Sequence, residues 1–208
     1  MFKIMQIQKE NSKESILKVA GEEFFAKGFK DSSMRIIAKK SGVGLSNIYN
    51  YFKNKDEIFC EVLASLLSAF NSMIEDHNRP EHISLNVFTD ADLQRKMIDD
   101  FVYLINQYRS ELKLLLFYAH GSSLENFREE FTVRNTKTGL EYIRKMKEKY
   151  PQVNTNISDF FMHTISSWWL SIIGEIVTHD DLSDVEIENF ISEYIVFVTG
   201  GWERLMNV

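Results

Sequence analysis

Apolar residues recur at helical spacing along almost the whole chain. The first helix that this spacing predicts covers residues 12–27, and Gly28 is expected to end it because glycine tolerates the left-handed conformation found after helices. No segment alternates apolar and polar residues between hairpin turns, so no strands are expected. The apolar side of this first helix is formed by Ile16, Leu17, Ala20, Phe24 and Phe25.

The same spacing predicts an all-α fold of about nine helices. Residues 77–89, which contain Pro80, are expected to form a loop or short turn, and residues 120–123 are expected to separate two helices. The longer helices are expected at 55–76, 90–108, 111–119, 124–150, from 156 or 158 to 179, and 183–207.

Two short helices joined by a tight turn are expected between residues 33 and 55. Ser32 or Ser33 is suited to begin the first of them, since a hydroxyl accepts from free backbone N–H groups. Gly42 is suited to end it in the left-handed conformation. The second short helix is expected over 45–51, and Asn54 with Glu57 has the spacing of a capping box at the start of the next helix. This arrangement predicts a helix-turn-helix.

The run from Ile16 to Leu63 resembles the TetR family of bacterial one-component regulators almost position by position. It reads ILKVAGEEFFAKGFKDSSMRIIAKKSGVGLSNIYNYFKNKDEIFCEVL. Three positions depart from the family pattern: Gly44, Leu45 and Ile36. The first two indicate an operator that is contacted differently from that of a typical relative.

The resemblance implies a three-helix DNA-binding head at 1–54 and a larger helical body at 55–208 that binds a ligand and dimerises. The outward polar residues of the second short helix are expected to face base edges, and others to contact phosphates. The predicted base contacts are Ser46, Asn47 and Asn50, and the predicted phosphate contacts are Tyr49, Lys55, Tyr51 and Ser33.

The charge of the chain is distributed unevenly. The 208 residues carry a net charge of −6, but residues 1–60 hold 11 Lys and Arg against 7 Asp and Glu, a net +4. A basic segment attached to an acidic remainder is the asymmetry expected of a DNA-binding head on a body that does not itself bind DNA.

The last two helices predict a homodimer. The helix that ends near residue 179 is apolar almost all round, so it needs cover on more than one side. Relatives in the TetR family pair these two helices with those of a second copy. The alternative is that both helices pack only within one chain. The predicted interface residues are Ile165, Trp169, Ile172, Ile191, Tyr194, Val198 and Trp202.

A small-molecule cavity of several hundred Å³ is expected in the body, lined by aromatic and aliphatic side chains with a few polar groups. Its effector is predicted to be largely apolar, and Arg134 leaves room for a carboxylate. An ordinary surface or core position is the alternative for each of these residues. The predicted lining residues are Phe101, Phe117, His120, Phe131, Asn135, His163 and Trp168.

Several classes of function are not supported by the sequence. There is no nucleophile elbow, phosphate-binding glycine loop, dinucleotide fingerprint or metal-ligand spacing, so no catalysis, cofactor or metal is expected. No run approaches a membrane span, and the single cysteine, Cys60, fits a reducing cytoplasm. We therefore expect a cytoplasmic homodimeric regulator, a repressor that binds a palindromic operator and is released by a small molecule. The alternative is a DNA-bound structural or division-control protein with no inducer.

Overall fold

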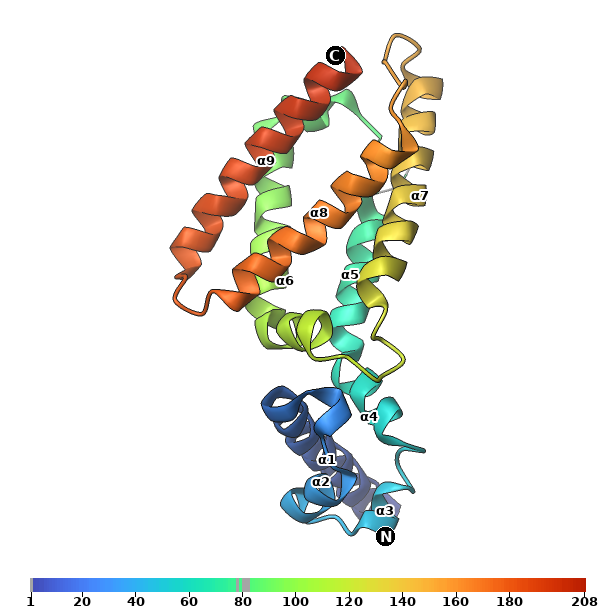
Figure 1. The fold of residues 1–208 in the computed structure, drawn as a ribbon, viewed down its shortest axis with the longest axis vertical. Coiled ribbons are helices and arrows are strands. Elements are labelled where there is room, and N and C mark those ends of the chain that lie inside the picture. The colour runs from blue at the N-terminus through green and yellow to red at the C-terminus, as the bar shows by residue number, and fades with distance from the viewer. Residues whose placement is uncertain (1, 78, 80–82) are drawn as a thin grey trace. The chain divides into compact units, whose positions relative to one another are not determined.

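The computed structural model describes residues 2–77, 79 and 83–208, and these residues form helices and connecting turns without a β-strand (Figure 1). The all-α prediction is confirmed. Residues 78 and 80–82 of the predicted loop lie outside the described part. The elements are α1 (Phe2–Asp31), α2 (Met34–Ser41), α3 (Leu45–Ile48), α4 (Lys55–Val62), α5 (Ala64–His77), the 3₁₀ turn η2 (Leu85–Phe88), α6 (Ala91–Phe117), α7 (Phe127–Lys149), α8 (Asp159–Thr178) and α9 (Asp184–Met206).

The helices pack into two compact units. The head unit comprises residues 1–68 together with 110–127, and the body unit comprises 69–109 together with 128–208. Helices α5 and α6 each contribute to both units. This division is based on packing, and the functional boundary after residue 54 stays a prediction.

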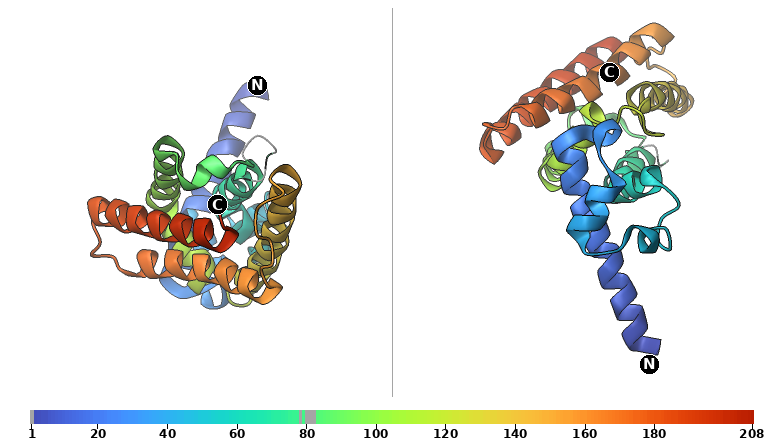
Figure 2. Two further views of the ribbon diagram at one scale, coloured as in Figure 1. Left: turned by 90° about the horizontal axis from the view of Figure 1, so that it is seen from above. Right: turned by 60° about the horizontal axis from the view of Figure 1, so that its bottom comes forward.

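Helix α1 begins at Phe2, ten residues before the predicted start, and its first turns extend past the other helices of the head unit (Figure 2). The expected end is confirmed, because Gly28 has φ 73° and interrupts the helical conformation. The aromatic core of the head unit lies on both sides of this break. The buried rings of Phe24, Phe29 and Phe59 pack in a triangle with centroid distances of 5.0–5.9 Å.

The predicted turn between the two short helices is present. Gly42 ends α2 in the left-handed conformation with φ 71°. Helix α3 is only four residues long instead of the seven expected, but hydrogen-bonded turns continue it as far as Phe52. Ile48 is fully buried and Phe52 nearly so, and these two side chains hold the segment against the head core.

One predicted helix is two helices. We expected 55–76 to be continuous, but the chain bends by 52° at Leu63, between α4 and α5. Leu63 has φ −93° and ψ −1° and is fully buried. Helical spacing does not reveal this bend, because apolar residues continue at the same spacing on both sides of Leu63.

Helix α6 contains the second interruption. It is kinked at Tyr108, where φ is −124° and ψ is 24°, close to the point where the sequence predicts one helix to end and another to begin. Arg109 follows the kink. Its guanidinium donates to the carbonyls of His179 at 2.6 Å and Ile176 at 3.3 Å, at the C-terminal end of α8, where backbone carbonyls run out of partners within the helix.

The body unit is organised around aromatic side chains. Trp169 of α8 stacks on Phe131 with centroids 5.3 Å apart, and also contacts Phe70 and Phe101. Helices α8 and α9 lie side by side (Figures 1 and 2). Their predicted start residues are confirmed: Ser158 caps α8, and Ser183 forms a capping box with Glu186 in α9.

No single helix of the described part has both the length and the apolar character of a membrane span. One bent pair, 55–62 with 64–76, meets that standard only when the two helices are taken together.

Candidate nucleic-acid interface

Helix α3 presents a polar surface to solvent. Ser46, Asn47 and Asn50 are exposed, while Ile48 points into the head core. An exposed asparagine carries both a donor and an acceptor, the pair needed to bind an adenine edge. The three predicted base contacts therefore lie on the solvent-exposed side of α3 and of the turn that continues it.

The predicted phosphate contacts are less uniform. Tyr49 is 52% exposed, whereas Tyr51 is half-buried. Ser33 is the N-cap residue of α2, as expected for Ser32 or Ser33, but the expected capping hydrogen bond from its hydroxyl is absent. Its phosphate contact stays a prediction. The alternative candidate, Ser32, is buried and donates to the carbonyl of Phe29 at 2.6 Å.

Lys55 occupies a structural position that the sequence did not suggest. Its ammonium group donates to the carbonyls of Phe29 at 2.6 Å and of Lys30 and Ser32 at 3.1 Å each. Burial lowers the pKa of Lys55, although the charge of Asp31 acts in the opposite direction. An ammonium has three protons to donate, so a phosphate contact by Lys55 requires it to share or release one of these carbonyls. The phosphate role of Lys55 stays a prediction.

Exposed cations near the turn were not among the predicted contacts. Arg35 and Lys39 of α2 and Lys53 before α4 are all exposed. The net positive charge of residues 1–60 was the only sequence signal for these cations. A charge count does not show which of the Lys and Arg side chains face outward, so they were not named.

A buried carboxylate joins α1 to α2. Glu23 is 1% exposed, and it lies 3.2 Å from the ammonium of Lys40 and 3.4 Å from that of Lys27. Burial alone would raise the pKa of Glu23, but hydrogen bonds and charge from Lys40 and Lys27 together lower it below its ordinary value. The carboxylate therefore ties the first helix of the helix-turn-helix to α1 while it is ionised.

We expect a Glu23→Gln variant to lose about 1.5–3 kcal/mol of unfolding free energy at pH 7, the usual range for a hydrogen bond to a charged group. A lowered pKa in the folded state gives stability above the unfolded-state value of about 4.3, and this stability is lost as pH falls through the folded-state value. The difference between variant and parent should therefore shrink in acid. Urea unfolding between pH 3 and 7 measures this. The exposed neighbour provides the control, Glu22→Gln, and an equal pH response in both variants would contradict the assignment.

The predicted ligand-lining residues do not form one set. Phe101 and Phe131 pack on Trp169, and Trp168 packs on Tyr194 and Phe197. Phe117 and His120 belong to the head unit, where both are exposed, because the second half of α6 packs there. Grouping them with the body residues was therefore wrong. Asn135 and His163 are half-buried in the body.

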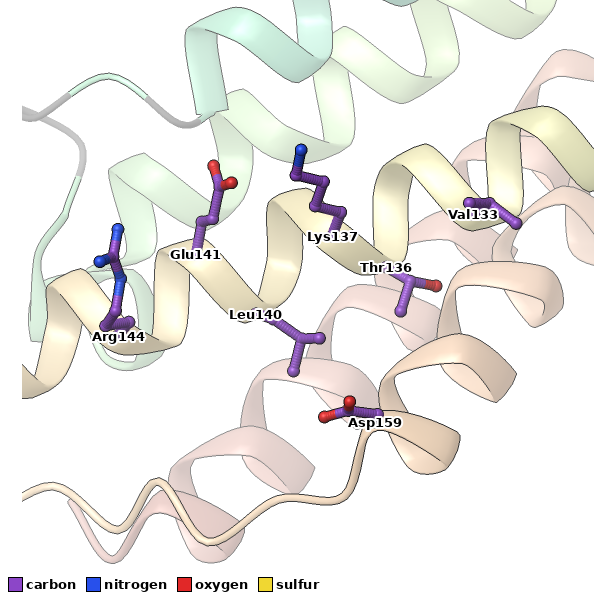
Figure 3. A pocket seen from close by; sticks show the side chains of 7 residues that line it. All are labelled: Val133, Thr136, Lys137, Leu140, Glu141, Arg144 and Asp159. Carbon is purple, nitrogen blue, oxygen red and sulfur yellow. The ribbon is translucent and has the colours of Figure 1, made fainter.

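An open hollow of ≈ 360 Å³ lies in the body between α7 and the start of α8 (Figure 3). Leu140 and Thr136 point toward the side where Asp159 lies, while Lys137 and Glu141 project from the other side of α7. None of the predicted ligand residues lines this hollow. Its lining residues are Val133, Thr136, Lys137, Leu140, Glu141, Arg144 and Asp159.

The predicted dimer residues mostly face inward. Ile172, Ile191 and Tyr194 are buried within the chain, so their side chains are not available to a second copy in this fold. Trp202 packs on a separate apolar cluster that includes Met146 and Met206. Ile165, Trp169 and Val198 are half-buried.

A different apolar set is exposed on α8 and α9. Phe197 is 68% exposed, and Gly200 and Gly201 have open space where a side chain would stand. The exposed large apolar residues of these two helices are Phe160, Phe161, Trp168, Val185, Phe190, Val196, Phe197 and Leu205. Helical spacing identified these helices as apolar but did not distinguish their two sides.

The described residues contain no group of three or more His, Cys, Asp or Glu side chains arranged to hold a metal ion. The polar surface of α3 and the cations beside it therefore form the best candidate site. Cations suit the phosphates of a nucleic acid, and exposed amide and hydroxyl groups suit hydrogen bonds to base edges.

Comparison with known proteins agrees with this interface. Residues 16–62 match the family model of bacterial regulatory proteins, tetR family. The chain is 35% identical over 68 residues to an uncharacterized HTH-type transcriptional regulator, YhgD, of Bacillus subtilis strain 168. That match covers 33% of this chain and 36% of YhgD, so it spans about a third of the relative's length.

Solved structures resemble the chain over most of its length. MexZ of Pseudomonas aeruginosa, described as a key repressor responsible for antibiotic resistance, superimposes with a TM-score of 0.62 at 18% identity, over 92% of this chain and 94% of MexZ. FadR of Bacillus subtilis, in complex with stearoyl-CoA, gives 0.58 at 16% identity over 88% and 97%. At such identities the likeness establishes the fold. Residues 16–62 therefore form a helix-turn-helix head of the TetR-family type, and it stands on a helical body whose fold resembles these solved structures.

Proposed function

We propose that this protein is a transcriptional repressor that binds a palindromic DNA operator as a homodimer. The observation that carries the proposal is the exposed polar side of α3, held in place by the Gly42 turn and flanked by exposed cations. Cations attract the phosphate backbone without sequence preference, and the polar side chains of α3 provide the sequence readout. Since its partner is bacterial DNA, the proposal places the protein in the cytoplasm.

The dimer is supported by the exposed apolar residues of α8 and α9. A two-fold pair uses the same surface twice, and a face with Phe197 beside Gly200 and Gly201 allows helices of two copies to approach closely. Such a pair would present two α3 helices to successive major grooves, roughly 34–36 Å apart. A palindromic operator follows from that symmetry.

Release by a largely apolar small molecule is the second part of the proposal. FadR, a protein of the same fold, was solved with stearoyl-CoA bound. Ligand binding in the body would favour a conformation in which α4 moves and the two heads no longer fit the operator. A coupling of about 1–3 kcal/mol would change operator affinity 5- to 150-fold.

A regulator without an inducer is the alternative. The observation that favours it is the close packing of Phe70, Phe101 and Phe131 around Trp169, where a ligand was expected to lie. If apolar compounds leave operator binding unchanged while the protein represses, this alternative replaces the ligand-responsive one.

The DNA-reading role is tested by selection from a pool of random duplex DNA. The full chain should enrich a palindromic sequence, and Asn47→Ala should relax preference at one position per half-site by about 1–3 kcal/mol. The cation variant Lys53→Ala is the comparison, since it should weaken specific and random DNA alike. Equal weakening of both kinds of DNA by Asn47→Ala would show that Asn47 does not read bases.

A further inference from the structure

A groove of ≈ 640 Å³ lies within the head unit and is not part of the DNA-reading surface. It is bounded by α1, by the end of α4 and by the half of α6 that follows the Tyr108 kink. All of its lining residues belong to this one compact unit. They are Leu17, Lys18, Gly21, Glu22, Phe25, Ala26, Glu61, Val62, Ser110, Glu111 and Leu114.

The groove has an apolar surface to receive an uncharged molecular framework. Leu114 is buried, Leu17 and Val62 are half-buried, and the ring of Phe25 is 41% exposed. The exposed part of this ring provides a contact face for a flat ligand.

Gly21 keeps the groove open. It lies in the middle of α1, where glycine is less favourable for the helix than alanine. Its φ is not positive, and an added Cβ would meet only Val62 Cγ1, at 3.7 Å, an ordinary contact distance. Neither backbone conformation nor close packing therefore requires glycine here, but a longer side chain at this position would occupy the groove.

The charge around the groove is negative, although the head as a whole is positive. Glu22, Glu61 and Glu111 line it, and Lys18 is the one cation among the lining residues. Glu61 also forms an ion pair with Lys13, which neutralises part of this charge. The remaining carboxylates favour a positively charged ligand and disfavour an anion of the same shape.

We propose that this groove binds an amphipathic organic cation, with an aromatic body against Phe25 and a quaternary or protonated nitrogen near Glu22 and Glu111. Cation–π attraction to the Phe25 ring adds to the carboxylate charge. Helices α1 and α4 form two walls of the groove, and both pack in the same unit as α2 and α3. A bound cation therefore shifts the packing of α1 and α4 and, with it, the position of α2 and α3. The ligand then weakens operator binding, and this second part rests on the proposed function.

The binding part is tested on the full chain without DNA, by ligand-observed NMR titration. Three probes share one aromatic body and differ in charge: (1-naphthylmethyl)trimethylammonium, 1-naphthylmethanol and 1-naphthylacetate. The cation should bind at least tenfold more tightly than the alcohol, and the carboxylate least. Equal affinities for all three would overturn the proposal.

Variants locate the site. Glu111→Gln should reduce the affinity for the cationic probe about fivefold, the equivalent of about 1 kcal/mol for the loss of one nearby charge. Glu130→Gln, an exposed change on α7 outside the groove, should have no effect. Gly21→Met should abolish binding by filling the groove, while Gly21→Ala should retain it. Circular dichroism confirms folding of each variant, and if Gly21→Met does not fold, Glu111→Gln alone decides.

The coupling part is measured separately, as operator affinity with and without the cationic probe. At saturation the probe should reduce the affinity at least fivefold in the parent protein and not in Gly21→Met. If the cation binds but operator affinity does not change, the proposed binding site stands and its regulatory role is overturned. If the protein binds no operator at all, the proposed function fails, while the binding of the cation to the groove is still decided by the NMR titration.

Discussion

A Phe197→Glu variant is expected to be monomeric and to lose at least a hundredfold in operator affinity. Phe197 is 68% exposed on α9, next to two glycines that leave its surroundings open. In a two-fold interface the new carboxylate would be buried twice and would face its own copy, and each uncompensated buried charge costs several kcal/mol. One head alone holds only one half-site, so the loss on DNA follows from the loss of the dimer.

Sedimentation at low micromolar concentration gives the oligomeric state, and gel-shift titration gives the affinity. Tyr103→Glu is the matched control, because Tyr103 is 64% exposed on α6, away from the proposed interface. Phe197 contacts the ring of Trp168 within its own chain, but because it is 68% exposed we expect the Phe197→Glu monomer to stay folded and to unfold cooperatively in urea. A Phe197→Glu protein that stays dimeric would rule out this face.

The second large effect is expected from Phe131→Ala, which should lower the unfolding free energy by about 3–5 kcal/mol. Phe131 is 2% exposed and stacks on Trp169, so its removal leaves a cavity at the centre of the aromatic cluster. A residue that served mainly as a ligand contact would give a much smaller loss. Phe131 therefore distinguishes a packed body core from an open pocket.

Urea unfolding at one fixed protein concentration measures this loss, because a dimer's stability depends on concentration. Val133→Ala, two residues along the same helix and exposed, should change stability by less than about 0.5 kcal/mol. Similar values for the two variants would mean that Phe131 contributes little to the core.

The helices and their ends were predictable where local chemistry decides them. Gly28 and Gly42 end helices through their positive φ, and Ser183 begins one through its hydroxyl. The bend at Leu63 was not predictable, because α4 and α5 continue one apolar spacing across it. Leu63 is fully buried, and a buried leucine fits a continuous helix as well as a bend, so no local pattern marks the break.

The head interface was read from sequence more successfully than the body. In α3, polar and apolar positions differ clearly, so the exposed side of the helix could be assigned. Helix α8 is apolar on almost every side, and spacing alone could not decide whether Ile172 or Phe160 faces outward. The contacts of Lys55 with three backbone carbonyls could not be predicted either, since no local sequence pattern shows that these carbonyls end near its ammonium group.

The sharing of α6 between the two units has a consequence for dissecting this protein. The head is not a continuous piece of chain: residues 110–127 return to it, and the carbonyl of Tyr118 accepts the N–H of Phe29 at 2.9 Å. The backbone N–H of Ser123 likewise donates to Asp56 at 2.7 Å. A fragment cut after Ser68 would keep the whole helix-turn-helix but would expose the surface that this returning segment covers. Domain swaps that graft only the N-terminal quarter onto another body would therefore separate the DNA-reading helices from part of their own support.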